Sequence, residues 1–264
     1  MTVRLLGIDY LPACTALAAD RDWPPEDRKW RLLFRVGRVH AIDAPDGDGL
    51  AAVVVATPYE DAVAISMMLV ARRYERQGYG KAVLLDALRG ARTAVLSATS
   101  LGKPLYEHLG FRSVGLISTY FGVLAPTAPT GRTRAFEPSD AEFVSTLDEK
   151  AFGARRTALL ASLPGFGDLR VAAHGFGGAW DNDGTRVLGP VVASDRSAAR
   201  DLLHDLAAPG GADRADGDHR HRWLRDWAAG RGLDHRFTCD LMVLGPDLPG
   251  DPAMLVTPVM LALG

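Results

Sequence analysis

The stretch MMLVARRYERQGYGKA, residues 67–82, decides the fold of the N-terminal half. It begins inside an apolar run, Ala62–Val70, which predicts a strand buried on both faces. A short polar segment follows, and in it Gly78 and Gly80 allow a tight turn and a close backbone approach. The periodicity from Lys81 to Arg89 then predicts a helix. The sequence therefore predicts a strand, a glycine-bearing loop and a helix in direct succession.

The loop between this strand and this helix has the features of a diphosphate site. The first amides of a helix lack partners within it, and the helix dipole favours negative charge there. Arg76 and Lys81 add positive charge on either side. The dinucleotide fingerprint is absent because Val83 stands where a third small residue is needed, and no Gly-Lys-Ser/Thr of a P-loop is present. We therefore expect a diphosphate ligand without either of those two folds.

A second stretch, SATSLGKPLYEHLGFR at residues 97–112, narrows the choice of protein family. It continues the apolar strand predicted at Thr93–Ala98 and places Tyr106 on a short helix, four residues before Gly110-Phe111. Together the two stretches resemble the GNAT (GCN5-related N-acetyltransferase) superfamily. Its first motif is a strand followed by Gln/Arg-x-x-Gly-x-Gly/Ala at a helix start, and its later motif has a Tyr before Gly-Phe. The resemblance follows the element order over residues 1–122 and is sharp over residues 68–111.

The resemblance implies an α+β (mixed α/β) fold, a cofactor and a set of site residues. The fold would be two tandem GNAT-like domains, each with a mixed, partly splayed central sheet flanked by helices. Acetyl-CoA would be the co-substrate, with no metal. The expected cofactor-binding residues are Met68, Leu69, Val70, Arg76, Gln77, Gly78, Tyr79, Gly80 and Lys81. Tyr106 falls at the position of the general acid that protonates the leaving thiolate. Glu75 departs from the motif, and we expect it to point away from the phosphates.

The second half of the chain looks like a degenerate copy of the first. Residues 136–153 and 189–206 resemble the corresponding parts of tandem GNAT proteins. The counterpart of the glycine loop, residues 191–200, lacks glycine and contains Asp195, so no working cofactor site is expected there. We predict an acetyl-CoA-binding domain at 1–122, a Pro-containing linker at 123–131 and a GNAT-like domain at 132–264. The polar stretch Pro209–Asp218 is predicted to be a mobile loop.

The predicted function is transfer of an acetyl group to a primary amine of a small molecule, such as an amino acid, a polyamine or an amino-bearing metabolite or antibiotic. No general base is identifiable. Four residues are candidates for the amine site: Asp20, Trp23, Trp30 and Glu60. The tryptophans could equally be core anchors, and Glu60 with Asp61 could be a solvated turn. Two alternative functions stay open: an acyl-CoA-sensing module without turnover, and other acyl chemistry on the same fold.

Composition limits the partners and the compartment. The chain has 264 residues and a net charge of −2, so we expect neither nucleic acid nor a membrane as a partner. No apolar run is long enough to span a bilayer, and the N-terminus does not read as a secretory signal. Cys14 and Cys239 are expected to be buried free thiols of a cytoplasmic monomer or homodimer. The pair His219 and His221 is read as part of a solvated loop and not as a metal site.

Overall fold

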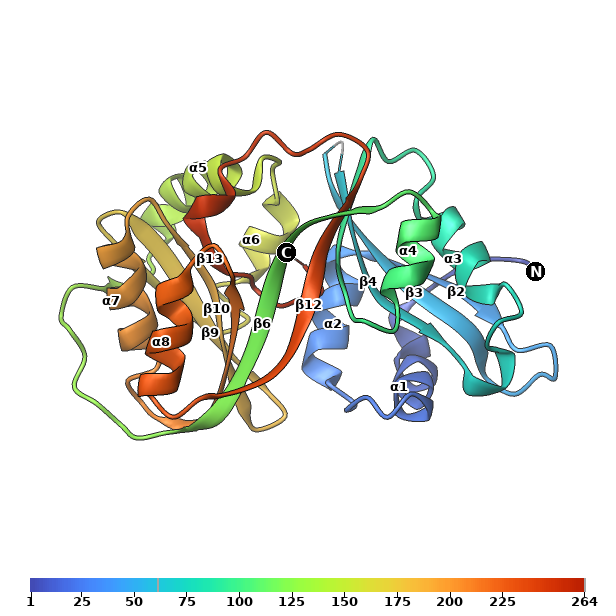
Figure 1. The fold of residues 1–264 in the computed structure, drawn as a ribbon, viewed down its shortest axis with the longest axis horizontal. Helices are drawn as coiled ribbons and strands as arrows, with labels where there is room; N and C mark the ends of the chain where they lie inside the picture. Colours follow the sequence, from blue (N-terminus) through green and yellow to red (C-terminus); the bar gives the residue numbers. More distant parts are fainter. Residues whose placement is uncertain (61, 264) are drawn as a thin grey trace.

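The protein is built around one continuous mixed sheet (Figure 1). The computed structural model describes residues 1–60 and 62–263. In these ranges the strand order is β1-β2-β3-β4-β5-β12-β6-β11-β10-β9-β8-β7, with β13 paired to β10. The strands are β1 (Arg4–Leu6), β2 (Arg38–Asp43), β3 (Leu50–Tyr59), β4 (Ala62–Val70), β5 (Thr93–Ala98), β6 (Arg112–Leu124), β7 (Arg134–Ala135), β8 (Asp168–Ala172), β9 (Gly175–Asn182), β10 (Thr185–Ala193), β11 (Gly211–Asp218), β12 (Asp234–Leu244) and β13 (Leu255–Thr257).

Helices cover both faces of this sheet, which confirms the predicted fold class. They are α1 (Leu11–Asp20), α2 (Asp27–Val36), α3 (Tyr79–Ala87), α4 (Lys103–His108), α5 (Ala141–Phe152), α6 (Thr157–Ser162), α7 (Arg196–Leu206) and α8 (Arg222–Gly230). On one face, α1, α2, α5 and α6 enclose a single apolar core that extends across both halves. On the other face, α3 and α4 cover the N-terminal strands, and α7 and α8 cover the C-terminal strands. No helix within the described ranges is long and apolar enough to cross a membrane.

The prediction of a mobile loop at Pro209–Asp218 is wrong. Most of that segment is β11, which pairs with β6 over its full length and with β10 at residues 213–215. The sequence did not indicate this strand, because Asp213, Asp216 and Asp218 interrupt the apolar pattern although their side chains are buried. Asp216 and Asp218 are neutralised by Arg214 and Arg220. Tertiary pairing therefore overrides a local sequence that is typical of a loop.

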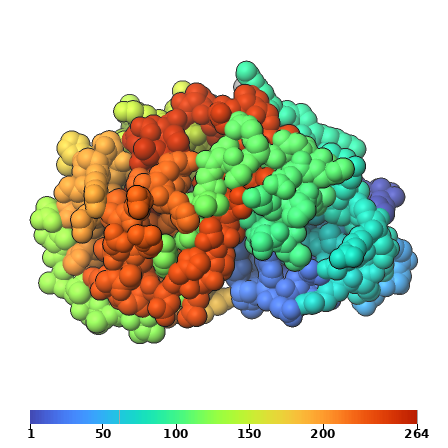
Figure 2. All heavy atoms as spheres, viewed as in Figure 1, coloured from blue at the N-terminus to red at the C-terminus, as the bar shows by residue number. Residues whose placement is uncertain are grey.

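The two halves exchange a strand at the centre of the sheet (Figure 1). β12, from the C-terminal half, lies between β5 and β6 and is antiparallel to both. β6, from the N-terminal half, continues the sheet into the C-terminal half through β11. Figure 2 shows the C-terminal residues, in orange and red, packed directly against the green residues of the N-terminal half. The domain boundaries at residues 122 and 132 stay a prediction, since the sheet has no break between the halves.

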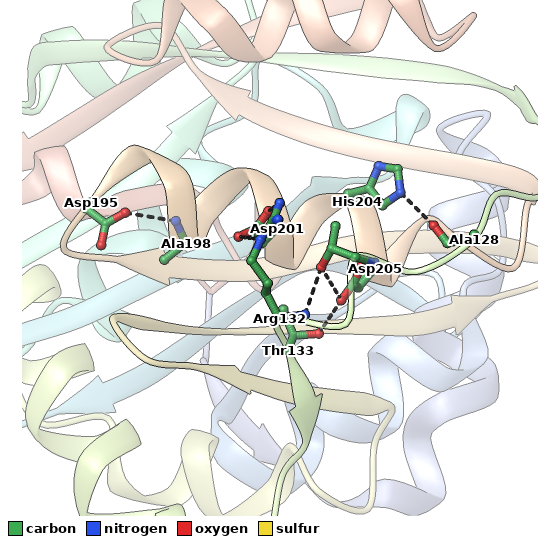
Figure 3. A network of polar contacts seen from close by, with 9 residues as sticks. Ala128, Arg132, Thr133, Asp195, Ala198, Asp201, His204 and Asp205 are labelled. Atoms are coloured by element: carbon green, nitrogen blue, oxygen red, sulfur yellow. Dashed lines mark hydrogen bonds and ion pairs between the residues drawn. The ribbon is translucent and has the colours of Figure 1, made fainter.

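The segment that connects the two halves is fixed along α7 (Figure 3). β6 continues to Leu124, beyond residue 123 where the linker was predicted to begin. Arg132 donates two hydrogen bonds to Asp201, at 2.7 and 2.6 Å. Thr133 Oγ1 donates to Asp205 Oδ2 at 2.7 Å. These contacts tie the connection to the C-terminal half.

Candidate functional site

Strands β4 and β5 form a fork that opens toward their C-terminal ends. They are parallel and pair only from Ala62 with Thr93 to Ile65 with Leu96. Beyond that point β4 continues to Val70 without pairing to β5. A bulge in β4 accompanies the divergence: its register with β3 shifts, and Met67 has a φ of +47°. This confirms the partly splayed sheet predicted for the N-terminal half.

The glycine loop, residues 76–82, presents unpaired backbone amides beside this fork. The first hydrogen bond of α3 runs from Ala82 N to Gly78 O, at 3.0 Å. Among the described residues, the amides of 76–81 have no acceptor. Gly78 adopts a left-handed conformation with φ of +88°, which favours glycine. A Cβ on Gly80 would lie 2.8 Å from Met68 Cε and 3.2 Å from Val70 Cγ2 of β4, so a side chain there would require Met68 to shift.

The charges around the glycine loop leave a positive surface. Arg76 and Lys81 are exposed and make no ion pair within the described part of the chain. The carboxylate of Glu75 pairs with Arg21, at the C-terminal end of α1. Asp20 accepts a hydrogen bond from Arg72 N at 2.8 Å and so fixes the start of the segment that follows β4. The negative charge of Glu75 is thus balanced by a residue of α1, and two cations remain available to an anion.

Tyr106 lies on α4, on the same face of the sheet as α3. Its ring is 8% exposed and packs edge-to-face on Phe111, with ring centroids 5.6 Å apart. Burial raises the pKa of Tyr106 to about 12, so its hydroxyl is protonated at neutral pH. Lys103, at the start of α4, donates to Asp240 of β12 at 2.8 Å. The exchanged strand therefore holds the helix that carries Tyr106.

The residues predicted to form the amine site do not gather in one place. Asp20 is engaged with Arg72, as described above. Trp23 is 36% exposed and lies 6.0 Å from Lys29 Nζ, whereas Trp30 is fully buried in the core beside Phe34. Glu60 lies in the turn before β4, at the end of the strand opposite the fork, and faces Arg155 at 3.8 Å. Asp61 lies outside the described residues.

A cavity that sequence reasoning missed lies between the two halves. It measures about 520 Å³. Ile65, Leu96 and Ser97 line it at the base of the fork, and Leu241 of β12 and Phe152 of α5 line other sides. Its walls come from six strands, from α5 and from the C-terminal segment, so no local motif could have indicated it. Neither Tyr106 nor the glycine loop contributes to its lining.

The equivalent fork in the C-terminal half is filled by the chain itself. β10 and β11 are parallel and pair only over Arg186–Leu188. Beyond that point β13 pairs with β10 at Val191 and Val192, where the N-terminal fork is open. The side chain of Asp195 caps α7 by accepting from Ala198 N at 2.9 Å (Figure 3). With its fork closed and its helix start capped by a carboxylate, this half has the features predicted for a degenerate copy.

The remaining candidate residues have structural partners. His219 Nε2 lies 2.7 Å from Ser118 Oγ, and His221 Nε2 lies 2.9 Å from the carbonyl oxygen of Leu255. Over residues 1–60 and 62–263, no group of three or more His, Cys, Asp or Glu is arranged to hold a metal ion. Cys14 and Cys239 are buried free thiols, as predicted.

Comparisons with known proteins agree with this geometry. Residues 8–111 match the model of the acetyltransferase (GNAT) family, and residues 144–255 match that of an acetyltransferase (GNAT) domain. An uncharacterized N-acetyltransferase of Bacillus subtilis is 24% identical over 234 residues, which is 83% of this chain and 82% of the relative.

Solved structures share the fold at low identity. A Pyrococcus horikoshii protein, assigned provisionally as an acetyltransferase, has a TM-score of 0.86 at 20% identity, covering 100% of this chain and 95% of its own. A tandem GNAT protein from the clavulanic acid biosynthesis pathway has a TM-score of 0.64 at 15% identity, covering 93% and 99%. A GCN5-related N-acetyltransferase from Sphaerobacter thermophilus has a TM-score of 0.61 at 20% identity, covering 94% and 98%.

Proposed function

Because the chain belongs to the GNAT acetyltransferases, we propose that it transfers an acetyl group from acetyl-CoA to the primary amine of a small molecule. The observation that carries the proposal is the set of unpaired amides at residues 76–81, next to the open fork of β4 and β5. We assign cofactor binding to the N-terminal half alone, because β13 occupies the corresponding fork of the other half.

The residues of the fork and the glycine loop fit this cofactor. Amides at a helix start, with Arg76 and Lys81 beside them, suit a diphosphate. The unpaired edge of β4 at Met68–Val70 suits the amides of the pantetheine arm, because peptide-like groups pair with an open strand edge. The helix start at Gly80 lies against Met68 and Val70, which places the loop beside the strand edge.

The chemistry requires a neutral amine, a polarised thioester and a proton donor for the thiolate. Acetyl-CoA supplies the acetyl group: a C–N bond forms to the amine, the C–S bond breaks, one proton leaves the nitrogen and one reaches the sulfur. Backbone N–H groups of β4 at residues 68–70 are assigned to polarise the carbonyl. Tyr106 is assigned as the acid, since its hydroxyl is protonated over the whole physiological pH range.

Binding is tested by thermal unfolding with and without acetyl-CoA. We expect saturating acetyl-CoA to raise the Tm of the protein, since a ligand that binds only the folded state stabilises it. The double variant Arg76→Glu, Lys81→Glu should lose most of this rise, because both side chains are exposed and their reversal repels phosphate without disturbing the core. Arg92→Glu, at an exposed position just before β5, is the control and should keep it. Gly80→Glu should also abolish the rise.

Turnover is tested by release of the CoA thiol with a panel of amines. Tyr106→Phe should lower kcat by about 10²-fold or more while keeping the acetyl-CoA-induced rise in Tm. An unchanged kcat would show that Tyr106 is not the general acid. Binding of acetyl-CoA without turnover of any amine would favour the sensing alternative instead.

A further inference from the structure

The cavity between the halves lies at the base of the fork, where residues from both faces of the sheet line it. Ile65 and Leu96 form the last pair of the parallel ladder, and Ser97 follows directly; all three line the cavity. Ala64 and Val95, which also line it, point to the face covered by α1, α2 and α5. Tyr106 and α3 belong to the other face, to which Ile65 and Leu96 also contribute. A ligand in this cavity would therefore lie directly at the base of the fork.

The lining is mostly apolar, and of its charged residues only Asp218 is buried. Of its 24 residues, only Arg112, Asp218, Arg220 and Asp247 carry a charge. Arg112 pairs with Asp247 at 2.6 Å, and Arg220 pairs with Asp218 and also donates its backbone N–H to it at 2.8 Å. Arg112, Arg220 and Asp247 are exposed, whereas Ile65, Leu96 and the other wall residues are mostly buried. Each carboxylate thus already has a cation, and none is left for a ligand.

Resting on the proposed function, we propose that this cavity receives the acceptor, and that the acceptor is a primary amine carried on an apolar body, not a polycation. The volume of about 520 Å³ is that of a small-molecule pocket. Its wall residues, such as Val95, Leu241 and Leu255, would bury the hydrocarbon part of the ligand.

An apolar pocket also explains how the chain can work without an evident base. A low-dielectric surrounding disfavours the ammonium form and lowers the pKa of a bound amine. The neutral amine needed for attack on the thioester is then favoured by burial alone. A second or third ammonium on the same ligand would have to lose its water with no unpaired carboxylate to receive it, so polyamines and aminoglycoside-like amines are disfavoured.

The test compares two series of amines with the full chain and acetyl-CoA, following release of the CoA thiol. For the n-alkylamines from propylamine to hexylamine, kcat/KM should rise about fourfold per methylene. Putrescine and spermidine should be far poorer acceptors than hexylamine. A flat chain-length series, or a preference for spermidine, would overturn the inference and leave the proposed function in place.

A substitution in the cavity wall should change the preference between amines in a defined direction. Leu241→Glu places an unpaired carboxylate in the cavity wall and should lower kcat/KM for hexylamine while raising it for putrescine. Leu5→Glu, on an exposed leucine of β1, is the matched control and should change neither. If Leu241→Glu does not fold, the wild-type series decides alone.

Failure of this inference and failure of the proposed function give different experimental results. If acetyl-CoA raises the Tm but no amine of either series is acetylated, the acceptor class is wrong. If acetyl-CoA neither raises the Tm nor is consumed, the proposed function and the inference fall together.

Discussion

The ion pair between Asp148 of α5 and Arg156 offers a sharp test of how the cavity is held together. Both side chains are at most 1% exposed. The contact is bidentate, with Nε to Oδ2 at 2.9 Å and a terminal nitrogen to Oδ1 at 2.6 Å. Arg156 also donates to the carbonyl oxygen of Leu263 at 3.3 Å, and Tyr59 donates to the same oxygen at 3.0 Å. The pair therefore joins α5, the C-terminal segment and the N-terminal half around the cavity.

Replacing Asp148 by alanine should be strongly destabilising. It removes the carboxylate of Asp148 from the buried guanidinium of Arg156, and breaking a buried pair from one side costs about 3–5 kcal/mol. For a chain of this size each kcal/mol lowers the Tm by about 2–4 °C, so the expected fall is about 6–20 °C. Since α5 and the C-terminal segment line the cavity, the KM for an amine should also rise.

The measurement is urea unfolding at pH 7.5, followed by tryptophan fluorescence, together with the Tm. Asp226→Ala is the matched control, because it also removes the carboxylate of an Asp–Arg pair, but one whose side chains are 65% and 73% exposed. That control should cost no more than about 1 kcal/mol. The double variant Asp148→Leu, Arg156→Met should recover much of the loss, since both charges leave together. A cost for Asp148→Ala equal to that of Asp226→Ala would refute the reasoning.

Three further predictions address single side chains. Burial raises the pKa of Asp213 to about 6, above the value of about 3.9 in an unfolded chain, so folding stability should fall as the pH rises through this window. Asp213→Asn should accordingly add about 1–3 kcal/mol at pH 7.5 and nothing at pH 3, by urea midpoints, and an equal gain at both pH values would contradict this. Asp240→Asn frees Lys103 and the start of α4, so kcat should fall roughly tenfold while the acetyl-CoA-induced rise in Tm persists; loss of that rise would show a different role. Because the pKa of Tyr106 is about 12, its hydroxyl should stay protonated up to pH 10. Any fall of kcat between pH 8 and 10 should therefore be the same in the wild type and in Tyr106→Phe, as pH–rate profiles of both would show.

The C-terminal half contributes both to the N-terminal sheet and to the cavity. β12 completes the N-terminal sheet and, through Asp240, holds the helix of Tyr106. The C-terminal segment closes its own fork with β13 and lines the cavity with Leu255. Removing this half would therefore expose β5 and β6 and open the cavity, so the two halves are expected to act only together.

Local sequence was sufficient wherever neighbours along the chain make the structure. β4 and β5 begin and end where the apolar patterns placed them. The glycine loop could also be predicted from the sequence. Gly78 has a left-handed backbone, and Gly80 lies close against β4. These features follow from steric rules that act over a few residues.

What the sequence by itself determined is the cofactor-side motif and the fold class. Only the tertiary structure decided that β11 is a strand, that β12 and β6 change halves, that Trp30 belongs to the core and that an apolar cavity lies at the fork. The physical reason is that strand pairing and cavity walls depend on residues more than a hundred positions apart, such as Leu241 beside Ser97. No periodicity or spacing within either segment carries that information.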